Sequence, residues 1–188
     1  AYTLPWAFMT HSNIVLNVLH SHYEGKGAND FLNTAVHEVY HIGYGKNRIY
    51  RQEAKTVSTR IYAILDSFQN EGLATYVGYK AQYFFPANDD EDYLMLEDIN
   101  EVKRLLKMLN ELFNEASTCS DNELKSKAWD IGTTQRAYYV VGAYMAKIID
   151  EDLGRESLLE TIEQGPIYFV STYNKLVEPE MQVIDFKP

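Results

Sequence analysis

Cysteine is almost absent from this chain of 188 residues, in which Cys119 is the only example. A single cysteine cannot form an intramolecular disulfide, and it cannot supply a cysteine-rich zinc site. A catalytic thiol would need a histidine partner, and the sequence places none near Cys119. We therefore expect Cys119 to be structural.

Long apolar runs and basic stripes are also missing. No apolar stretch reaches the roughly 20 residues that a membrane-spanning helix requires. The formal net charge is -10, so we expect no nucleic-acid partner. Residues 1–8 lack the basic head and apolar centre of an intact signal peptide. A signal peptide that has been cleaved off, or a further segment upstream, is an alternative that the sequence leaves open. The compartment and the oligomeric state are therefore left unassigned.

The remaining composition is that of an ordinary globular protein, with 46% hydrophobic and 23% charged residues. The length predicts a single domain over residues 1–188. Branched aliphatic residues predict a strand at 12–19, and an extended piece at 3–9 could pair with it. Helical periodicity predicts helices at about 29–42, 51–84, 92–118, 135–153, 155–164 and 166–177. We expect a polar connector at 119–134 and an extended tail at 178–188. The expected fold class is α+β and mostly α-helical, with a small N-terminal strand element and a helical C-terminal part.

Glycine and capping residues set the expected helix boundaries. Gly43 and Gly45 should end the first helix, because glycine readily adopts C-cap geometry. Asp66 and Ser67 can both act as N-caps, so the second helical region could be two helices with a break there. Gly154 should end the helix at 135–153.

The first expected helix carries the sequence His37-Glu38-x-x-His41. Histidines four residues apart lie on one helix face and can bind one metal ion, and the glutamate beside them could activate a water on that ion. The alternative is a polar helix face that holds these residues by chance, although such matches are uncommon. The helix also has an apolar stripe opposite the histidines, which are therefore not simple core residues. The stripe consists of Leu32, Ala35, Val36, Val39 and Ile42.

A catalytic zinc needs a third protein ligand besides these two histidines. The metzincin continuation is absent, because Tyr44 and Asn47 occupy its glycine and histidine positions. Glu71 is the best candidate: it lies on the shoulder of an apolar stripe, where a buried carboxylate needs a partner such as a metal. Glu53 is a rival ligand, and a plain ion pair between Glu71 and a lysine or arginine is the other alternative. Gly72 next to Glu71 would let another helix approach closely.

His37-Glu38-x-x-His41 followed by Asn70-Glu71-Gly72-x-Ala74 resembles the gluzincin metallopeptidases, the thermolysin-like branch of the zincins. More narrowly, the chain resembles poorly characterised bacterial families of zinc-dependent peptidases. The resemblance covers residues 34–80 and, more loosely, 136–154. It implies a zincin-like fold and Zn²⁺ held by His37, His41 and Glu71. It also implies a peptide or protein substrate, with Glu38 as general base.

Such enzymes often use a tyrosine or histidine from a later helix to stabilise the oxyanion. Tyr139 lies three residues before Gly142 and matches a Tyr-x-x-Gly pattern of related sequences, which implies this role; plain packing is the alternative. Tyr138 shares a face with apolar residues and is expected in the core. Arg136 could contact a substrate carboxylate, but solvation at the surface is the favoured reading.

The sequence departs from the thermolysin pattern at Thr75, where an acidic residue would orient a zinc-binding histidine. Another partner is then needed, with Asp66, Asn70 or a backbone carbonyl as candidates. The resemblance also implies that a strand at 14–19 pairs with extended substrate. His20 and His22 could line that cleft, although ordinary loop positions are favoured.

The second function that fits these patterns is a non-catalytic, zinc-containing domain that binds peptides or regulates a partner. An intact Glu38 favours the peptidase, because a purely structural zinc site has no need of a base there.

Overall fold

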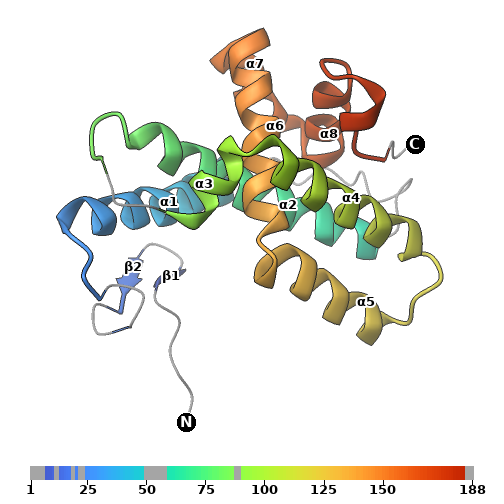
Figure 1. Cartoon of the computed structure of the whole chain (residues 1–188), viewed down its shortest axis with the longest axis horizontal. Helices are drawn as coiled ribbons and strands as arrows, with labels where there is room; N and C mark the ends of the chain where they lie inside the picture. The colour runs from blue at the N-terminus through green and yellow to red at the C-terminus, as the bar shows by residue number, and fades with distance from the viewer. Residues whose placement is uncertain are drawn as a thin grey trace.

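The computed structural model describes residues 7–10, 13–17, 20, 24–48, 59–86 and 90–184. This part is mostly helical, and its sheet has two strands (Figure 1). The strands are β1 (Ala7–Thr10) and β2 (Asn13–Leu16). The α-helices are α1 (Ala28–Asn47), α2 (Thr59–Ala81), α3 (Glu91–Glu97), α4 (Ile99–Glu115), α5 (Asp121–Trp129), α6 (Ala137–Leu153), α7 (Arg155–Gln164) and α8 (Pro166–Asn174). A π-helical turn (Asp130–Thr134) precedes α6, and a 3₁₀ turn (Pro179–Met181) follows α8.

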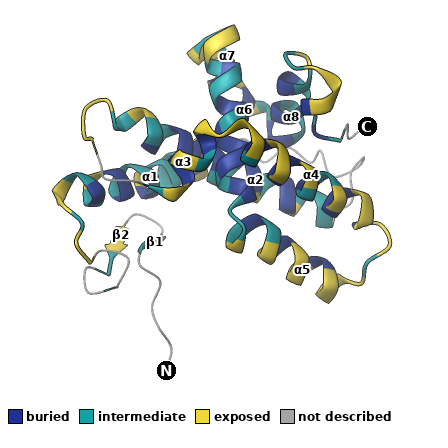
Figure 2. Ribbon diagram, in the orientation of Figure 1, coloured by how far each residue is buried: buried dark blue, intermediate teal, exposed yellow. Residues whose placement is uncertain are grey.

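The crossing of α2 and α6 forms the centre of the fold (Figure 1). A Cβ atom on Gly72 of α2 would lie 2.3 Å from the Cα atom of Gly142 on α6. A side chain at Gly72 would therefore force the two helices apart, since well-packed interiors have no room for added atoms. The expected close helix approach at Gly72 is confirmed. The dark-blue buried residues in Figure 2 gather on and around these two helices.

Two helices continue where the sequence predicted an end or a break. α1 runs through Gly43 and Gly45 to Asn47, so its predicted end was wrong. The residue between these glycines, Tyr44, is 4% exposed and is held by α2, which keeps the last turn helical despite its glycines. α2 is continuous past Asp66. The Asp66 carboxylate accepts hydrogen bonds from Tyr44 of α1 and from Arg48, the residue after α1, and does not cap a new helix.

Other segments have more boundaries than predicted. The helix expected at 92–118 is interrupted at Asp98, whose side chain accepts a hydrogen bond from the backbone N–H of Asn100 and caps α4. The expected connector at 119–134 contains α5 and the π-helical turn. α5 begins with a capping box between Ser120 and Glu123. The predicted boundaries at Gly154 and between α7 and α8 are confirmed.

The N-terminal strands form an antiparallel hairpin beside α1. Ala7 pairs with Leu16 and Thr10 pairs with Asn13, so the predicted pairing of the two extended pieces is confirmed over these residues. The tail is only partly extended, because the 3₁₀ turn follows Glu178. In the described residues, no helix combines the length and the apolar character needed to cross a bilayer.

α1 buries its polar side. Leu32 and Val39 of the apolar stripe are 42% and 55% exposed, within the part of the chain that the structure describes. The buried residues of α1 are mostly polar: Asp30, Asn33, Thr34, Glu38 and Tyr44. The side of α1 that faces the fold is therefore the side that carries the candidate site.

Candidate metal centre

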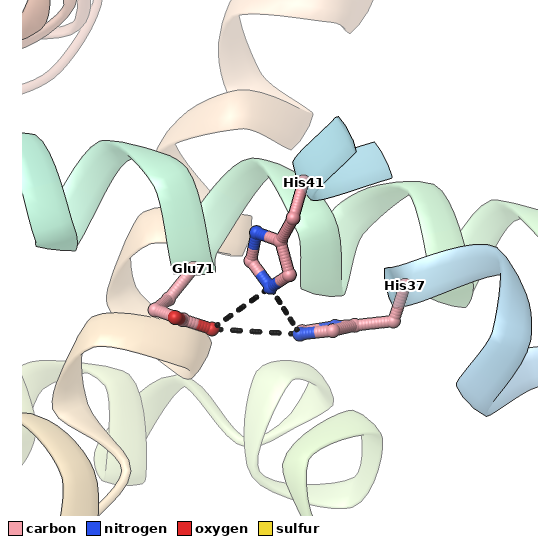
Figure 3. Close-up of side chains that lie close together, drawn as sticks. All are labelled: His37, His41 and Glu71. Carbon is pink, nitrogen blue, oxygen red and sulfur yellow. Dashed lines mark hydrogen bonds and ion pairs between the residues drawn. The ribbon is translucent and has the colours of Figure 1, made fainter. Parts of the chain in front are cut away.

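Three side chains from α1 and α2 converge on one point (Figure 3). The Nε2 atoms of His37 and His41 lie 3.1 Å apart. Glu71 Oε2 lies 3.4 Å from His37 Nε2 and 3.5 Å from His41 Nε2. The structure therefore brings together the three residues that the sequence singled out, and Glu71 faces these histidines in place of the alternative lysine or arginine.

The size of this triangle fits a tetrahedral metal ion. Zinc bonds of about 2.0–2.2 Å place two of its ligand atoms about 3.3–3.6 Å apart. The three observed separations, from 3.1 to 3.5 Å, are close to that edge length. Two imidazole nitrogens and one carboxylate oxygen are also a ligand set that zinc accepts. The group can therefore hold a metal ion such as zinc.

α1 and α2 run antiparallel, with hydrogen bonds fixing both ends of their contact. At the start of α1, Asn33 Nδ2 donates to the Phe85 carbonyl oxygen at 2.8 Å. Near its end, the Tyr44 hydroxyl donates to Asp66 at 3.2 Å and to Gln69 at 3.1 Å. The histidines and Glu71 lie between these anchors, so the two helices cannot slide without breaking them.

Asn70 orients one of the histidines. Its Oδ1 atom lies 3.0 Å from His41 Nδ1. An amide oxygen can only accept, so Nδ1 donates its proton and Nε2 keeps its lone pair for an ion. Of the three candidate partners, Asn70 makes this contact, whereas Asp66 binds Arg48 at 2.5 Å. Thr75 is buried, and its hydroxyl has no hydrogen-bond partner in the described part of the chain.

The electrostatics of the site keep Glu71 ionised. Burial opposes its ionisation, but in the absence of an ion the Nε2 atoms of His37 and His41 can carry protons and donate to Glu71, which lowers its pKa to about 2. Glu38 behaves differently, because burial raises its pKa while the nearby His37 and His41 partly offset that rise. Glu38 is 8% exposed and close enough to all three other groups to feel their charge. The site thus holds one ionised carboxylate and one whose proton affinity is raised.

Tyr139 lies against the same group from α6. Its ring stacks on His37 with centroids 6.2 Å apart and an interplanar angle of 16°. Gly142, one turn further on, is the residue that packs on Gly72, so the helix crossing places Tyr139 beside the turn that carries Glu71. Burial and the nearby Glu71 raise the pKa of Tyr139 to about 12, so its hydroxyl stays protonated at neutral pH.

Arg136 is not a solvated surface residue, and that favoured reading was wrong. Its guanidinium carbon lies 3.3 Å from the centroid of the Tyr139 ring. It also donates two hydrogen bonds to Asp92 of α3, at 2.8 Å and 2.5 Å. Arg136 has a φ of 68°, a left-handed conformation that is costly for a residue with a side chain. This pairing holds the guanidinium on one face of the Tyr139 ring, while His37 stacks with the same ring.

The sequence did not identify Asp92. It is 44 residues from Arg136, and no periodicity links an acidic turn to a distant helix start. The expectation for Tyr138 is confirmed, because it is 6% exposed and packs in the core. Glu53 and His22, together with residues 18–19 of the expected cleft strand, lie outside the described residues. Pairing of β2 with substrate stays a prediction.

A search of curated proteins and a search of solved structures each found no match to this chain. A family model described as "Putative zinc dependent peptidase (DUF5700)" matches residues 1–181. This match covers nearly the whole chain, including α1, α2 and α6, which carry the candidate metal centre. The chain therefore belongs to the family described as "Putative zinc dependent peptidase".

Proposed function

We propose that this protein is a zinc-dependent metallopeptidase of the gluzincin type with a zincin-like fold. His37, His41 and Glu71 are the zinc ligands in this proposal. The observation that carries it is the triangle of their ligand atoms, whose sides of 3.1 to 3.5 Å suit one tetrahedral ion. The family description adds support, since it names a zinc-dependent peptidase.

Glu38 is the general base. A bound zinc ion would supply Lewis-acid chemistry, making a water more acidic and polarising the peptide carbonyl. The Glu38 carboxylate accepts the proton of the attacking water and then donates it to the leaving amine nitrogen. Its raised pKa suits both steps, because a stronger base takes the proton more readily and can still release it. The substrate is a peptide or a protein.

Tyr139 donates a hydrogen bond to the oxyanion that develops on the attacked carbonyl. A pKa of about 12 keeps its hydroxyl proton in place for this purpose. Arg136 and His37 both pack against the Tyr139 ring, so these two contacts orient its hydroxyl before substrate binds. Asp92 is a positioning residue that acts through Arg136.

The test is the variant Glu38→Gln, with Glu160→Gln on the exposed surface of α7 as the matched control. We expect Glu38→Gln to keep about one zinc per chain, because the amide replaces no ligand. Its cleavage of an unfolded protein such as casein should fall by about 10²–10⁴-fold, the contribution of a general base. Elemental analysis and a fluorescent cleavage assay measure the two quantities.

The outcomes separate the two function classes. Wild-type turnover in Glu38→Gln would refute the mechanism. A wild-type protein that holds zinc and binds peptides but cleaves none would instead support the non-catalytic peptide-binding domain. The burial of Glu38 beside the site favours the enzyme, since a structural zinc site gains nothing from a carboxylate held there at the cost of burial.

A further inference from the structure

A groove of about 700 Å³ begins at Glu71 and Tyr139 and runs away from the candidate metal centre. One wall is a single face of α2, where the lining residues recur every three or four positions from Arg60 to Glu71. The eleven steps from Arg60 to Glu71 span about 16 Å along the helix at 1.5 Å per residue. The groove therefore has the length of an extended peptide of about five residues.

The opposite wall comes from α5 and the start of α6, and the middle of the groove is apolar. Ile64 of α2 and Ala128 of α5 are each 8% exposed, and Tyr138 covers the same space. Trp129 is 66% exposed and also lines the groove, so its large apolar ring is accessible beside the buried side chains of Ile64 and Ala128. Such a lining binds apolar groups, because water at these walls is released on contact.

The far end of the groove is polar and internally paired. Arg60 forms an ion pair with Asp121 and donates to the backbone carbonyls of Ala116 and Cys119. These contacts join the start of α2 to the turn before α5, and they fix the spacing of the two walls at this end of the groove. The guanidinium is already engaged, so the selective part of the groove is its apolar middle.

We propose that this α2–α5 groove binds the substrate stretch on one side of the cleaved bond, and that its middle takes a bulky apolar side chain, aromatic or long aliphatic. The proposal rests on the proposed peptidase function. Its argument is continuity: Glu71 and Tyr139 line the groove and also belong to the candidate site, so a chain held in the groove reaches the candidate metal centre. The volume is within the range of about 300–1,000 Å³ that ligand pockets occupy.

Ala63→Trp tests this occupant. Ala63 is exposed and lines the groove about 12 Å along α2 from Glu71, so a tryptophan there obstructs the apolar middle without reaching the ligands. Asn100→Trp, at an exposed position at the start of α4, is the matched control. If Ala63→Trp fails to fold, Lys125→Trp enters from the opposite wall, with Lys107→Trp on α4 as its control.

Two assays read the result. The first measures cleavage of capped decapeptides in which one position at a time is phenylalanine, leucine, alanine or glycine. We expect the zinc-loaded wild type to prefer phenylalanine or leucine over glycine by about tenfold or more at one position near the cleaved bond. Ala63→Trp should reduce this preference at least fivefold, and Asn100→Trp should keep it. The second assay measures binding of the same peptides to zinc-loaded Glu38→Gln with and without Ala63→Trp.

The outcomes distinguish the groove from the function. Cleavage with no apolar preference, or a preference equal in Ala63→Trp and Asn100→Trp, would overturn the groove proposal while the peptidase stands. Absence of cleavage with tight, Ala63→Trp-sensitive binding of the phenylalanine peptide would support the groove and refute the peptidase. Binding that Ala63→Trp leaves unchanged would overturn the groove whatever the activity.

Discussion

α1 and α4 are both long surface helices, but they bury opposite kinds of side chain. α4 buries a regular apolar stripe and leaves its charges in water, as helical periodicity predicts. That stripe contains Val102, Leu105, Leu106, Leu109, Leu112 and Phe113. α1 turns its polar side inward, with Asn33 and Glu38 buried, while Leu32 and Val39 stay 42% and 55% exposed within the described residues.

This difference shows two ways of holding a helix in place. α4 is stabilised by removing apolar surface from water, which contributes about 25 cal/mol per Å². α1 leaves Leu32 and Val39 of its apolar stripe in water, and burying its polar groups would be unfavourable without partners. Its partners are the hydrogen bonds of Asn33, Tyr44 and Arg48 to the α2 region, together with the candidate metal centre. α1, which buries its polar side, is therefore positioned by hydrogen bonds and by the candidate metal centre more than by apolar packing.

The largest loss of stability should follow from truncating the buried stripe of α4. Leu109 is 0% exposed, so Leu109→Ala removes buried methyl groups and leaves a cavity. We expect the free energy of unfolding to fall by about 3 kcal/mol, within the usual range for such truncations. The zinc content of the folded protein should not change, because α4 supplies no ligand. Urea denaturation with zinc present measures the loss; a loss below about 1 kcal/mol would mean that the stripe is not core.

The next effect concerns the α1 side. Removing zinc with a chelator should lower the free energy of unfolding of the wild type by about 2.7 kcal/mol relative to zinc at 100 times its dissociation constant. Leu109→Ala should respond to the chelator by the same amount, because the two sites are independent. Glu71→Gln should respond little, since it lacks a ligand.

Thermal melts with and without chelator compare these proteins, with Glu160→Gln as the surface control. An equal response of Glu71→Gln and the wild type would exclude Glu71 from the ion site. An unresponsive wild type would show that no bound ion helps to hold α1 against α2.

The sequence predicted the site better than the helix boundaries. The four-residue spacing of His37 and His41 on one helix is a local signal, and it was enough to indicate two of the three clustered residues. The continuation of α1 through its glycines depends on Tyr44 meeting α2, a tertiary contact that local propensity does not contain.

Some of the missed features had a signal and some had none. Ser120 and Glu123 form a capping box, which is a sequence signal for the start of α5. Asp98 is a good N-cap, but the apolar residues on both sides of it keep one helical spacing and hide the interruption. The pairing of Arg136 with Asp92 had no such signal, because it joins two segments that only the fold brings together. Tertiary contacts of this kind decide the orientation of Tyr139, and they need the structure.

The smallest change in stability should follow from the same kind of truncation on the exposed side of α1. Val39→Ala removes methyl groups from a side chain that is 55% exposed, so little buried surface and no cavity are involved. Alanine also favours helix more than valine does, by a few tenths of a kcal/mol, roughly offsetting the lost contacts. We expect a stability change within about 0.5 kcal/mol of zero and unchanged zinc content. The same urea denaturation that reports on Leu109→Ala measures it. A loss above about 1.5 kcal/mol would mean that another surface covers this face of α1 in solution, and α1 would then be held on both sides.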